Sequence, residues 1–385
     1  MADASPLPRQ LPKWFADADL GIFIHWGPFA VPAFAPVMEP GRSLPDLLRE
    51  DPRHMGERLP YSEWYRNAMT IEGSPTATHH AKVWNNSPYE DFQDIFEAGL
   101  DDWDPASWAR QFARTGARYV VMVTKHHDGY CLWPTEVAHP TRPGWHSRRD
   151  LVGELATAVR NEGMRFGVYY STGLDWSIHH IPIRQIVDSP GCTPRSPAYL
   201  VYMTSQLHEL VNRYEPSVVW SDIGTPKGFD VAEFKNYLVD RVPDAVINDR
   251  WDHPVPGSGN PIGRRILNGI FAALSPRSRP DQPFYPGRHA LADFRTPEFS
   301  WPRGHVDFVW ETTRGMGSGF GHNAMETDAH RLSSGELISL YRQVTGTGGK
   351  MLLNVGPTAD GSIPPAESAL LEALGNAIRG DQSSD

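Results

Sequence analysis

Short apolar runs that end abruptly in polar side chains alternate along this chain with segments of helical spacing. Residues 120–124 are apolar up to Thr124 and lead into Lys125-His126-His127-Asp128, and Val218-Val219-Trp220 leads into Ser221-Asp222. Continuous apolar runs are typical of strands that are buried on both faces of a parallel sheet. The helical patterns between the runs indicate βαβ units. The pattern therefore predicts an α/β protein with a parallel sheet.

The order of these segments sharpens the prediction to a closed barrel. We expect strands at 20–25, 119–124, 165–170, 218–220, 245–247 and 351–355, and helices near 108–116, 151–163 and 198–214. About eight strand–helix units fit, which favours a (β/α)8-like (TIM-type) barrel formed as one catalytic domain over residues 1–385. Residues 36–80 are expected to be loop-rich. A long insertion is expected at about 252–291 and a frayed polar tail at about 378–385.

Charge and cysteine content narrow the class of protein. The formal net charge of −10 argues against nucleic acid or an anionic membrane as the main partner. Two cysteines do not imply a disulfide framework. The N-terminus lacks the apolar core of a signal peptide and no run of 18 apolar residues occurs, so we expect neither a signal peptide nor a membrane span, and a cytoplasmic location.

Polar residues at the strand ends are the candidates for chemistry, because α/β barrels place their active sites there. The candidates at strand or loop ends are His25, His126, His127, Tyr169, Asp222, Arg250, Glu298 and Glu311. Paired carboxylates suit glycoside hydrolysis, whereas several histidines with an aspartate would suit a metal-dependent hydrolase. Each residue also has a structural interpretation, since Asp222 could cap a helix or form an ion pair. His126 and His127 are not both expected to point inward, because adjacent strand residues face opposite sides.

Seven ordered motifs resemble those of family 29 glycoside hydrolases, the α-L-fucosidases, over about residues 11–378. They are Gly21-Ile-Phe-Ile-His25-Trp26-Gly27, Glu63-Trp64-Tyr65, Thr124-Lys-His-His-Asp-Gly129, Tyr169-Tyr-Ser171, Trp220-Ser-Asp222, Asn248-Asp-Arg250-Trp251 and Trp310-Glu311. The resemblance implies a (β/α)8-like barrel that hydrolyses terminal α-L-fucosides with retention, without a metal or an organic cofactor. The implied partner is a fucosylated glycoside or oligosaccharide.

The resemblance also implies roles for individual residues. Asp222 matches the nucleophile, and Glu298, in Asp293-Phe-Arg-Thr-Pro-Glu298, matches the acid/base of the broad-specificity branch, with Glu311 as its rival. The positions that match the sugar-binding residues of the family are His25, Glu63, Trp64, His126, His127, Tyr169, Trp220, Arg250 and Phe320. Tyr169 rather than Tyr170 is a choice of register, since only one of two neighbours faces the barrel mouth. Arg250 and nearby histidines are expected to keep Asp222 ionised.

Two departures from the family leave alternatives open. Many relatives carry a C-terminal β-sandwich, whereas this chain stops soon after the last barrel helix, so a neighbouring subunit of a homo-oligomer could cover the same surfaces. The insertion at 252–291 has apolar residues at helical spacing, and we expect it over the barrel mouth or against a second subunit.

The competing interpretations of the function are a catalytically silent carbohydrate-binding barrel and, with less support, the metal-dependent hydrolase.

Overall fold

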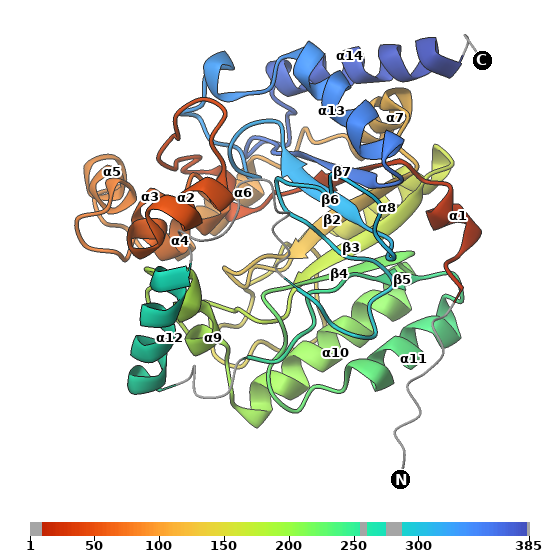
Figure 1. Ribbon diagram of the computed structural model, residues 1–385. Helices are drawn as coiled ribbons and strands as arrows, with labels where there is room; N and C mark the ends of the chain where they lie inside the picture. Colours follow the sequence, from red (N-terminus) through yellow and green to blue (C-terminus); the bar gives the residue numbers. More distant parts are fainter. Residues whose placement is uncertain (1–9, 255–259, 275–286, 383–385) are drawn as a thin grey trace.

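Seven parallel strands form one curled sheet at the centre of the computed structural model, which describes residues 10–254, 260–274 and 287–382 (Figure 1). The strands are β1 (Leu20–Ile24), β2 (Tyr119–Lys125), β3 (Arg165–Ser171), β4 (Val218–Asp222), β5 (Val246–Ile247), β6 (Glu311–Gly315) and β7 (Lys350–Val355). Their order in the sheet is β5-β4-β3-β2-β1-β7-β6. The predicted strands are confirmed to within one or two residues at their ends. The fold is the predicted (β/α)8-like barrel.

An irregular extended segment, residues 293–299, lies between the two edge strands β5 and β6. Its Asp293 N–H donates to Ile247 O at 2.9 Å on the β5 side. On the β6 side, Phe299 N–H donates to Thr313 O and Thr313 N–H donates to Pro297 O, both at 3.0 Å. Pro297 has no N–H of its own, so a regular ladder cannot form there. This segment takes the place of an eighth strand and brings Glu298 to the edge of the barrel.

Helices surround the sheet in Figure 1. The α-helices are α1 (Lys13–Ala16), α2 (Leu44–Glu50), α3 (Met55–Arg58), α4 (Tyr65–Ala68), α5 (Pro75–Trp84), α6 (Phe92–Ala98), α7 (Pro105–Thr115), α8 (Leu151–Asn161), α9 (Ser189–Cys192), α10 (Pro197–Tyr214), α11 (Val231–Arg241), α12 (Pro261–Leu274), α13 (Ser334–Gly346) and α14 (Pro365–Gln382). Short 3-10 helices include η3 (Ser62–Trp64), η5 (Ile186–Asp188) and η7 (Asp328–His330). Within the described residues, no helix has the length and apolar character needed to cross a membrane.

Two apolar cores follow from the alternation of side chains along the strands. The barrel interior holds Phe23, Val121, Val123, Tyr169, Val218, Trp220, Val246, Phe294 and Leu352. Phe15 of α1 closes the N-terminal end of this core and packs on Phe294, with ring centroids 4.8 Å apart. A larger core lies between the outer faces of the strands and the helices. With one end filled, the opening is left at the C-terminal ends of the strands.

The caps expected from the sequence are present. The Asp150 side chain accepts a hydrogen bond from Gly153 N–H at the start of α8, as predicted. Gly116 follows α7 with φ +91°, in the left-handed region that favours glycine at a helix end. Such caps satisfy backbone groups that the helix itself leaves unpaired, so they mark boundaries that periodicity alone places less well.

Two expectations differ from the structure. Residues 36–80 are not mainly loop but carry four short helices, α2 to α5. They were missed because α2 to α4 span at most two turns and because the buried residues of α5, Thr76 and His80, are polar. Ser43 with Asp46 at the start of α2, and Ser74 at the start of α5, supply their N-terminal caps. The tail expected to fray from residue 378 is helical as far as Gln382, since Ile378 packs against the outer core and Asp381 pairs with Arg342 at 2.7 Å.

The described part of the 252–291 insertion contains the expected helix, α12. It packs against η5, a neighbour of the barrel mouth. In Figure 1 the strand arrowheads point toward the side where α2, α3, α9 and α12 lie. Helix α12 is thus on the C-terminal side of the barrel, while residues 255–259 and 275–286 of the insertion lie outside the described residues.

Candidate active site

A pocket of about 80 Å³, here called the mouth pocket, lies at the C-terminal ends of the strands. Its lining comprises Phe23, His25, Leu44, Tyr61, Glu63, Trp64, His126, His127, Tyr169, Ile186, Trp220, Asp222, Ile223, Arg250, Glu298, Thr313 and Phe320. Both predicted catalytic carboxylates and all nine predicted sugar-binding residues are among them. Motifs that are up to 295 positions apart in the sequence therefore meet in one place.

Arg250 joins the two carboxylates of the pocket. Asp222 is the last residue of β4, and Arg250 follows β5, the next strand in the sheet. One terminal nitrogen of Arg250, Nη1, donates to Asp222 Oδ1 at 2.9 Å, and the other, Nη2, donates to Glu298 Oε2 at 2.9 Å. All three residues are at most 8 % exposed. A buried charge needs such a partner, and the planar guanidinium with its two terminal nitrogens suits two carboxylates at once.

The surroundings of Asp222 favour its ionised form. Burial acts to raise its pKa, but the charge of Arg250, the nearby His127 and hydrogen bonds from Tyr169 and Arg250 outweigh burial and lower the pKa below its usual value. The Tyr169 hydroxyl donates to Asp222 Oδ2 at 2.8 Å. Asp222 is therefore an anion at neutral pH, with one oxygen held by a cation and the other by a neutral donor.

The register of β3 selects Tyr169 over Tyr170. Tyr169 lies in the barrel interior, whereas the Tyr170 hydroxyl points outward and donates to Gln206 Oε1 at 2.7 Å. Tyr169 stacks on Trp220 with ring centroids 5.6 Å apart. Trp220 in turn lies under Arg250, whose guanidinium carbon is 4.4 Å from the ring centroid. These aromatic rings form one side of the mouth pocket.

Glu298 is held by two donors. Besides Arg250 on Oε2, the Tyr61 hydroxyl donates to Glu298 Oε1 at 2.8 Å. The following residue, Phe299, has φ +48°, which is unusual for a bulky side chain. The turn at Phe299 ends the irregular segment 293–299 just after the carboxylate has been directed into the pocket.

Contrary to the expectation for a strand pair, His126 and His127 both line the mouth pocket. The alternation rule does not apply because β2 ends at Lys125 and its pairing with β3 shifts register between Val123 and Lys125. The His127 side chain hydrogen-bonds Ser171 Oγ through Nδ1 at 2.7 Å and its Nε2 is 3.8 Å from Asp222 Oδ2. Burial lowers the pKa of His127 to about 4 and that of His25 to about 3, so both rings are neutral at neutral pH.

Three buried polar atoms of residues that line this pocket have no hydrogen-bond partner within the part of the chain that the structure describes. They are Glu63 Oε1, His126 Nδ1 and Thr313 Oγ1. The other oxygen of Glu63 accepts from Gly321 N–H at 2.8 Å, and burial raises the pKa of Glu63 to about 8. Buried polar groups are nearly always paired, so three unpaired atoms on residues that line one pocket indicate a polar ligand.

Glu311 lies elsewhere. It is the first residue of β6, at the N-terminal end of the barrel, and it does not line the mouth pocket. The Tyr119 hydroxyl donates to one of its oxygens, and Trp220 Nε1 donates to the other at 3.3 Å. Glu311 thus supports the underside of Trp220, on the opposite side of that ring system from the carboxylate pair.

Comparison with known proteins identifies the family to which the chain belongs. The family model described as "Alpha-L-fucosidase" matches residues 2–261 and 281–380. The chain belongs to the α-L-fucosidase family. The family resemblance seen in the motifs is thereby confirmed, and the barrel with its polar mouth is the shared fold.

Individual relatives agree over nearly the full chain. An alpha-L-fucosidase of Dictyostelium discoideum is 29 % identical over 384 residues, covering 96 % of this chain and 70 % of its own length. The human tissue alpha-L-fucosidase is 30 % identical, with 95 % of this chain and 67 % of its own length covered. The crystal structure of Thermotoga maritima alpha-fucosidase in complex with a mechanism-based inhibitor is 37 % identical, covers 97 % of this chain and 75 % of that one, and superposes with a TM-score of 0.77.

Six residues that line the mouth pocket were not singled out as site residues from the sequence: Phe23, Leu44, Tyr61, Ile186, Ile223 and Thr313. Tyr61 stands two positions before Glu63, and only that proximity hinted at it. Leu44, Ile186 and Ile223 add an apolar rim from α2, η5 and the end of β4. An isolated apolar residue in a loop-rich stretch carries no signal of its own, because most such residues are ordinary core.

Proposed function

We propose that this chain is a retaining exo-α-L-fucosidase that removes terminal α-L-fucosyl groups from glycosides or oligosaccharides. The observation that carries the proposal is the pair Asp222 and Glu298, two buried carboxylates in one pocket of a chain that belongs to the α-L-fucosidase family. Two carboxylates with separate roles are what retaining glycoside hydrolysis requires.

In the proposed first step, the Asp222 carboxylate attacks the anomeric carbon while a proton from Glu298 goes to the departing glycosidic oxygen. The C–O bond to the leaving group breaks and a fucosyl ester of Asp222 forms. In the second step, Glu298 takes a proton from water, whose oxygen attacks the anomeric carbon and releases Asp222. The lowered pKa of Asp222 suits the nucleophile, because the anion attacks.

Arg250 has a role in both states of Glu298. In the ligand-free structure each oxygen of Glu298 accepts one hydrogen bond, from Arg250 and from Tyr61. A proton on either oxygen must replace one of these donors before it can be passed to a leaving group. We infer that binding of the glycoside exchanges one of these contacts for the glycosidic oxygen, while Arg250 stays with Asp222.

The remaining lining fits a deoxy sugar. Glu63 and His126 offer the orphan atoms to sugar hydroxyls, with His25 and His127 as neutral neighbours. Fucose has a methyl group in place of a hydroxymethyl group, and Phe320 with Trp220 provides an apolar wall for it. The pocket of about 80 Å³ is below the roughly 300–1,000 Å³ of sites for drug-sized ligands, and we infer that lining side chains shift when the sugar enters.

Turnover of an aryl α-L-fucoside, compared with the aryl α-L-galactoside and the aryl β-D-galactoside, tests the proposal. We expect hydrolysis of the fucoside to dominate, and proton NMR at early times to show the α-anomer of fucose as the first product. Absence of turnover for the fucoside, with binding of fucose retained, would support the catalytically silent alternative instead. First appearance of the β-anomer would rule out retention.

A further inference from the structure

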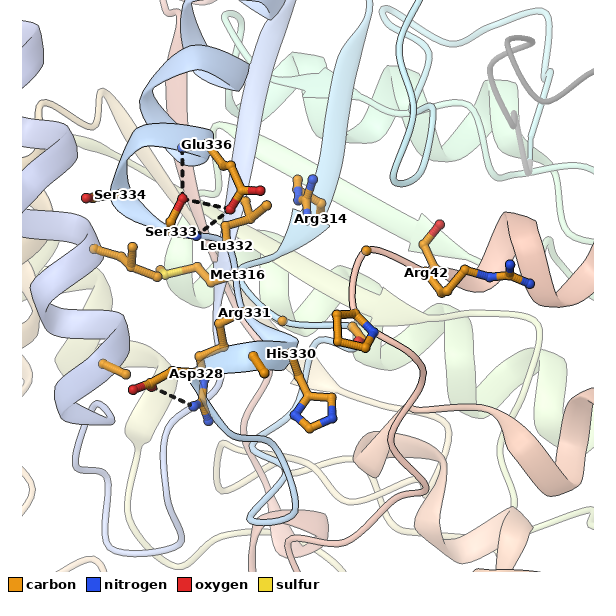
Figure 2. A pocket seen from close by; sticks show the side chains of 18 of the residues that line it. Arg42, Arg314, Met316, Asp328, His330, Arg331, Leu332, Ser333, Ser334 and Glu336 are labelled. Carbon is orange, nitrogen blue, oxygen red and sulfur yellow. Dashed lines mark hydrogen bonds and ion pairs between the residues drawn. The ribbon is translucent and has the colours of Figure 1, made fainter.

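A second, larger cavity lies beside the mouth pocket, and Figure 2 shows it from close by. This side cavity has a volume of about 850 Å³, within the range of ligand sites. It is bounded by residues 40–43 before α2, the end of β6 with Arg314 and Met316, residues 328–336, and the α14 side chains Ala366, Ala369, Leu370 and Ala373. Its position is on the outer side of β6, near the strand ends.

The two cavities share a wall that is one residue thick. At three places, neighbours in the chain face opposite cavities: Ser43 and Leu44, Phe299 and Glu298, and Arg314 and Thr313. In each pair the first-named residue lines the side cavity and the second lines the mouth pocket. Phe299 also packs on the far side, with its ring centroid 5.3 Å from that of Phe320. The residue next to the proposed acid/base is thus part of the dividing wall.

Of the three arginines that line the side cavity, Arg314 is the one that forms no ion pair with a carboxylate of the described residues. Arg42 pairs with Glu50, and Arg331 lies 3.8 Å from Asp328 and 4.0 Å from Glu326. Among the described residues Arg314 has no ion-pair partner, and Arg314 Nε donates a hydrogen bond to Gly315 O at 3.0 Å. Burial lowers the pKa of Arg314 to about 10, against the effect of Glu336, so the guanidinium stays charged at neutral pH.

The wall of the cavity around Arg314 suits a saccharide. The Arg314 guanidinium carbon is 5.4 Å from the centroid of the Phe299 ring. Met316, Leu332 and Leu370 give apolar surface, while Ser43, Ser318 and Ser334 give hydroxyl groups along the same cavity. A ring with one apolar face, several hydroxyls and a negative substituent could satisfy all three kinds of surface.

We propose that the side cavity receives the leaving-group part of the substrate and that Arg314 selects leaving groups with an anionic substituent, a carboxylate or a sulfate ester. The inference rests on the proposed function, because the acid/base stands on the side from which the leaving group departs. Phe299, the residue after Glu298, lies between the mouth pocket and Arg314, and we infer that a leaving group extending beyond Glu298 passes over the Phe299 side chain to reach Arg314.

Three matched substrates test this inference in the wild-type enzyme: an α-L-fucosyl glucoside, the corresponding glucuronide and the 6-O-sulfated glucoside. They share the linkage and differ at C6 of the leaving sugar. We expect kcat/KM for one or both anionic substrates to exceed that for the neutral one by about tenfold at low ionic strength, and the advantage to shrink as salt is added. Preference for the glucuronide or for the sulfate ester identifies which anion the cavity accepts.

Variants of Arg314 then locate the effect. Arg314→Gln should abolish the preference for anionic leaving groups, and Arg314→Lys should retain part of it. Arg110→Gln is the matched control, since Arg110 is an exposed arginine of α7 paired with Asp104 at 3.2 Å; it should keep the full preference. Equal kcat/KM for the three substrates in the wild type would overturn the inference, as would an equal loss for all three in Arg314→Gln. Lack of turnover of any α-L-fucoside would instead overturn the proposed function.

Discussion

The two ends of the barrel each bury a carboxylate, and the contrast between them separates chemistry from support. At the C-terminal end, Asp222 is held by Arg250, and its pKa is lowered despite burial. At the N-terminal end, burial raises the pKa of Glu311 to about 7, because its close partners Tyr119 and Trp220 are neutral donors. Similar burial thus gives opposite shifts, and the presence of a paired cation decides the direction.

Trp220 connects the two ends. Its ring lies beside Arg250 above, and its Nε1 donates to Glu311 below. A group that must be ionised to act needs the cation, whereas a group that only orients a ring does not. The comparison therefore predicts that changes at the mouth affect turnover, and that changes at the base of the barrel affect mainly stability.

The largest effect on turnover is expected for Asp222→Ala. The variant lacks the proposed nucleophile, so kcat for an aryl α-L-fucoside should fall by roughly three orders of magnitude or more, about 4 kcal/mol of transition-state stabilisation. Added azide should restore part of the activity and give a fucosyl azide of inverted configuration. Activity within tenfold of wild type would end the assignment of Asp222.

A smaller and substrate-dependent effect is expected for Glu298→Ala. A proton is needed most when the leaving group is poor, so kcat/KM for a fucosylated oligosaccharide should fall by about 10²–10³, but much less for an activated aryl fucoside. The ratio of the two rate constants is the measurement. If Glu311→Ala showed this dependence on the leaving group and Glu298→Ala did not, the two roles would have to be exchanged.

Tyr61→Phe should also lower kcat/KM more for poor leaving groups than for activated ones, but by less than Glu298→Ala does. The change removes the hydroxyl that donates to Glu298 Oε1 and keeps the ring. One neutral hydrogen bond corresponds to about 1 kcal/mol, so we expect a loss of about fivefold on poor leaving groups and less on activated ones. Tyr65→Phe is the control, because the Tyr65 hydroxyl bonds His80 Nδ1 at 2.9 Å, away from the mouth pocket. Equal ratios in both variants would remove Tyr61 from the proposed mechanism.

Much of the mouth could be predicted because its residues follow strands. Asp222 and Tyr169 are placed by strand register, which apolar runs reveal well. The joint placement of His126 and His127 was not predictable, since a register shift at the end of β2 is a property of its pairing with β3. Tyr61 depends on a tertiary contact 237 positions away in the sequence. Local patterns contain no information on such contacts.

The structural role of Glu311 could not be predicted from the sequence. Glu298 and Glu311 both lie in the last third of the chain, and their spacing alone favours neither as the acid/base. What separates them is that Glu298 ends an irregular strand and lines the mouth pocket, whereas Glu311 begins β6, two residues before Thr313, the residue that pairs with Glu298. That distinction needs the direction of the chain through the sheet, which the motif around Trp310 does not give.

The smallest effect on turnover is expected for Glu311→Gln, which keeps the shape of the side chain and an acceptor for Trp220. We predict kcat within about twofold of wild type, but a clear effect on stability. Between pH 4.5 and about 7 the native state keeps a proton on Glu311 that the unfolded state has lost, so the free energy of unfolding falls as pH rises through this window. A pKa raised from 4.5 to about 7 corresponds to roughly 3 kcal/mol, fully lost above pH 7. Glutamine cannot ionise and avoids this loss.

Urea unfolding at pH 5 and pH 8 should therefore show that the free energy of unfolding of Glu311→Gln increases relative to that of wild type as pH rises. Asp222→Asn should show the opposite sign in a lower pH window, because the lowered pKa of Asp222 contributes stability that is fully present above the usual pKa of 3.8 and is lost only as pH falls below it. Its difference from wild type should therefore stay constant between pH 5 and pH 8 and shrink in stronger acid. A difference between Glu311→Gln and wild type that stays constant from pH 5 to pH 8 would mean that Glu311 does not titrate in this window, and the contrast between the two ends of the barrel would lose its electrostatic basis.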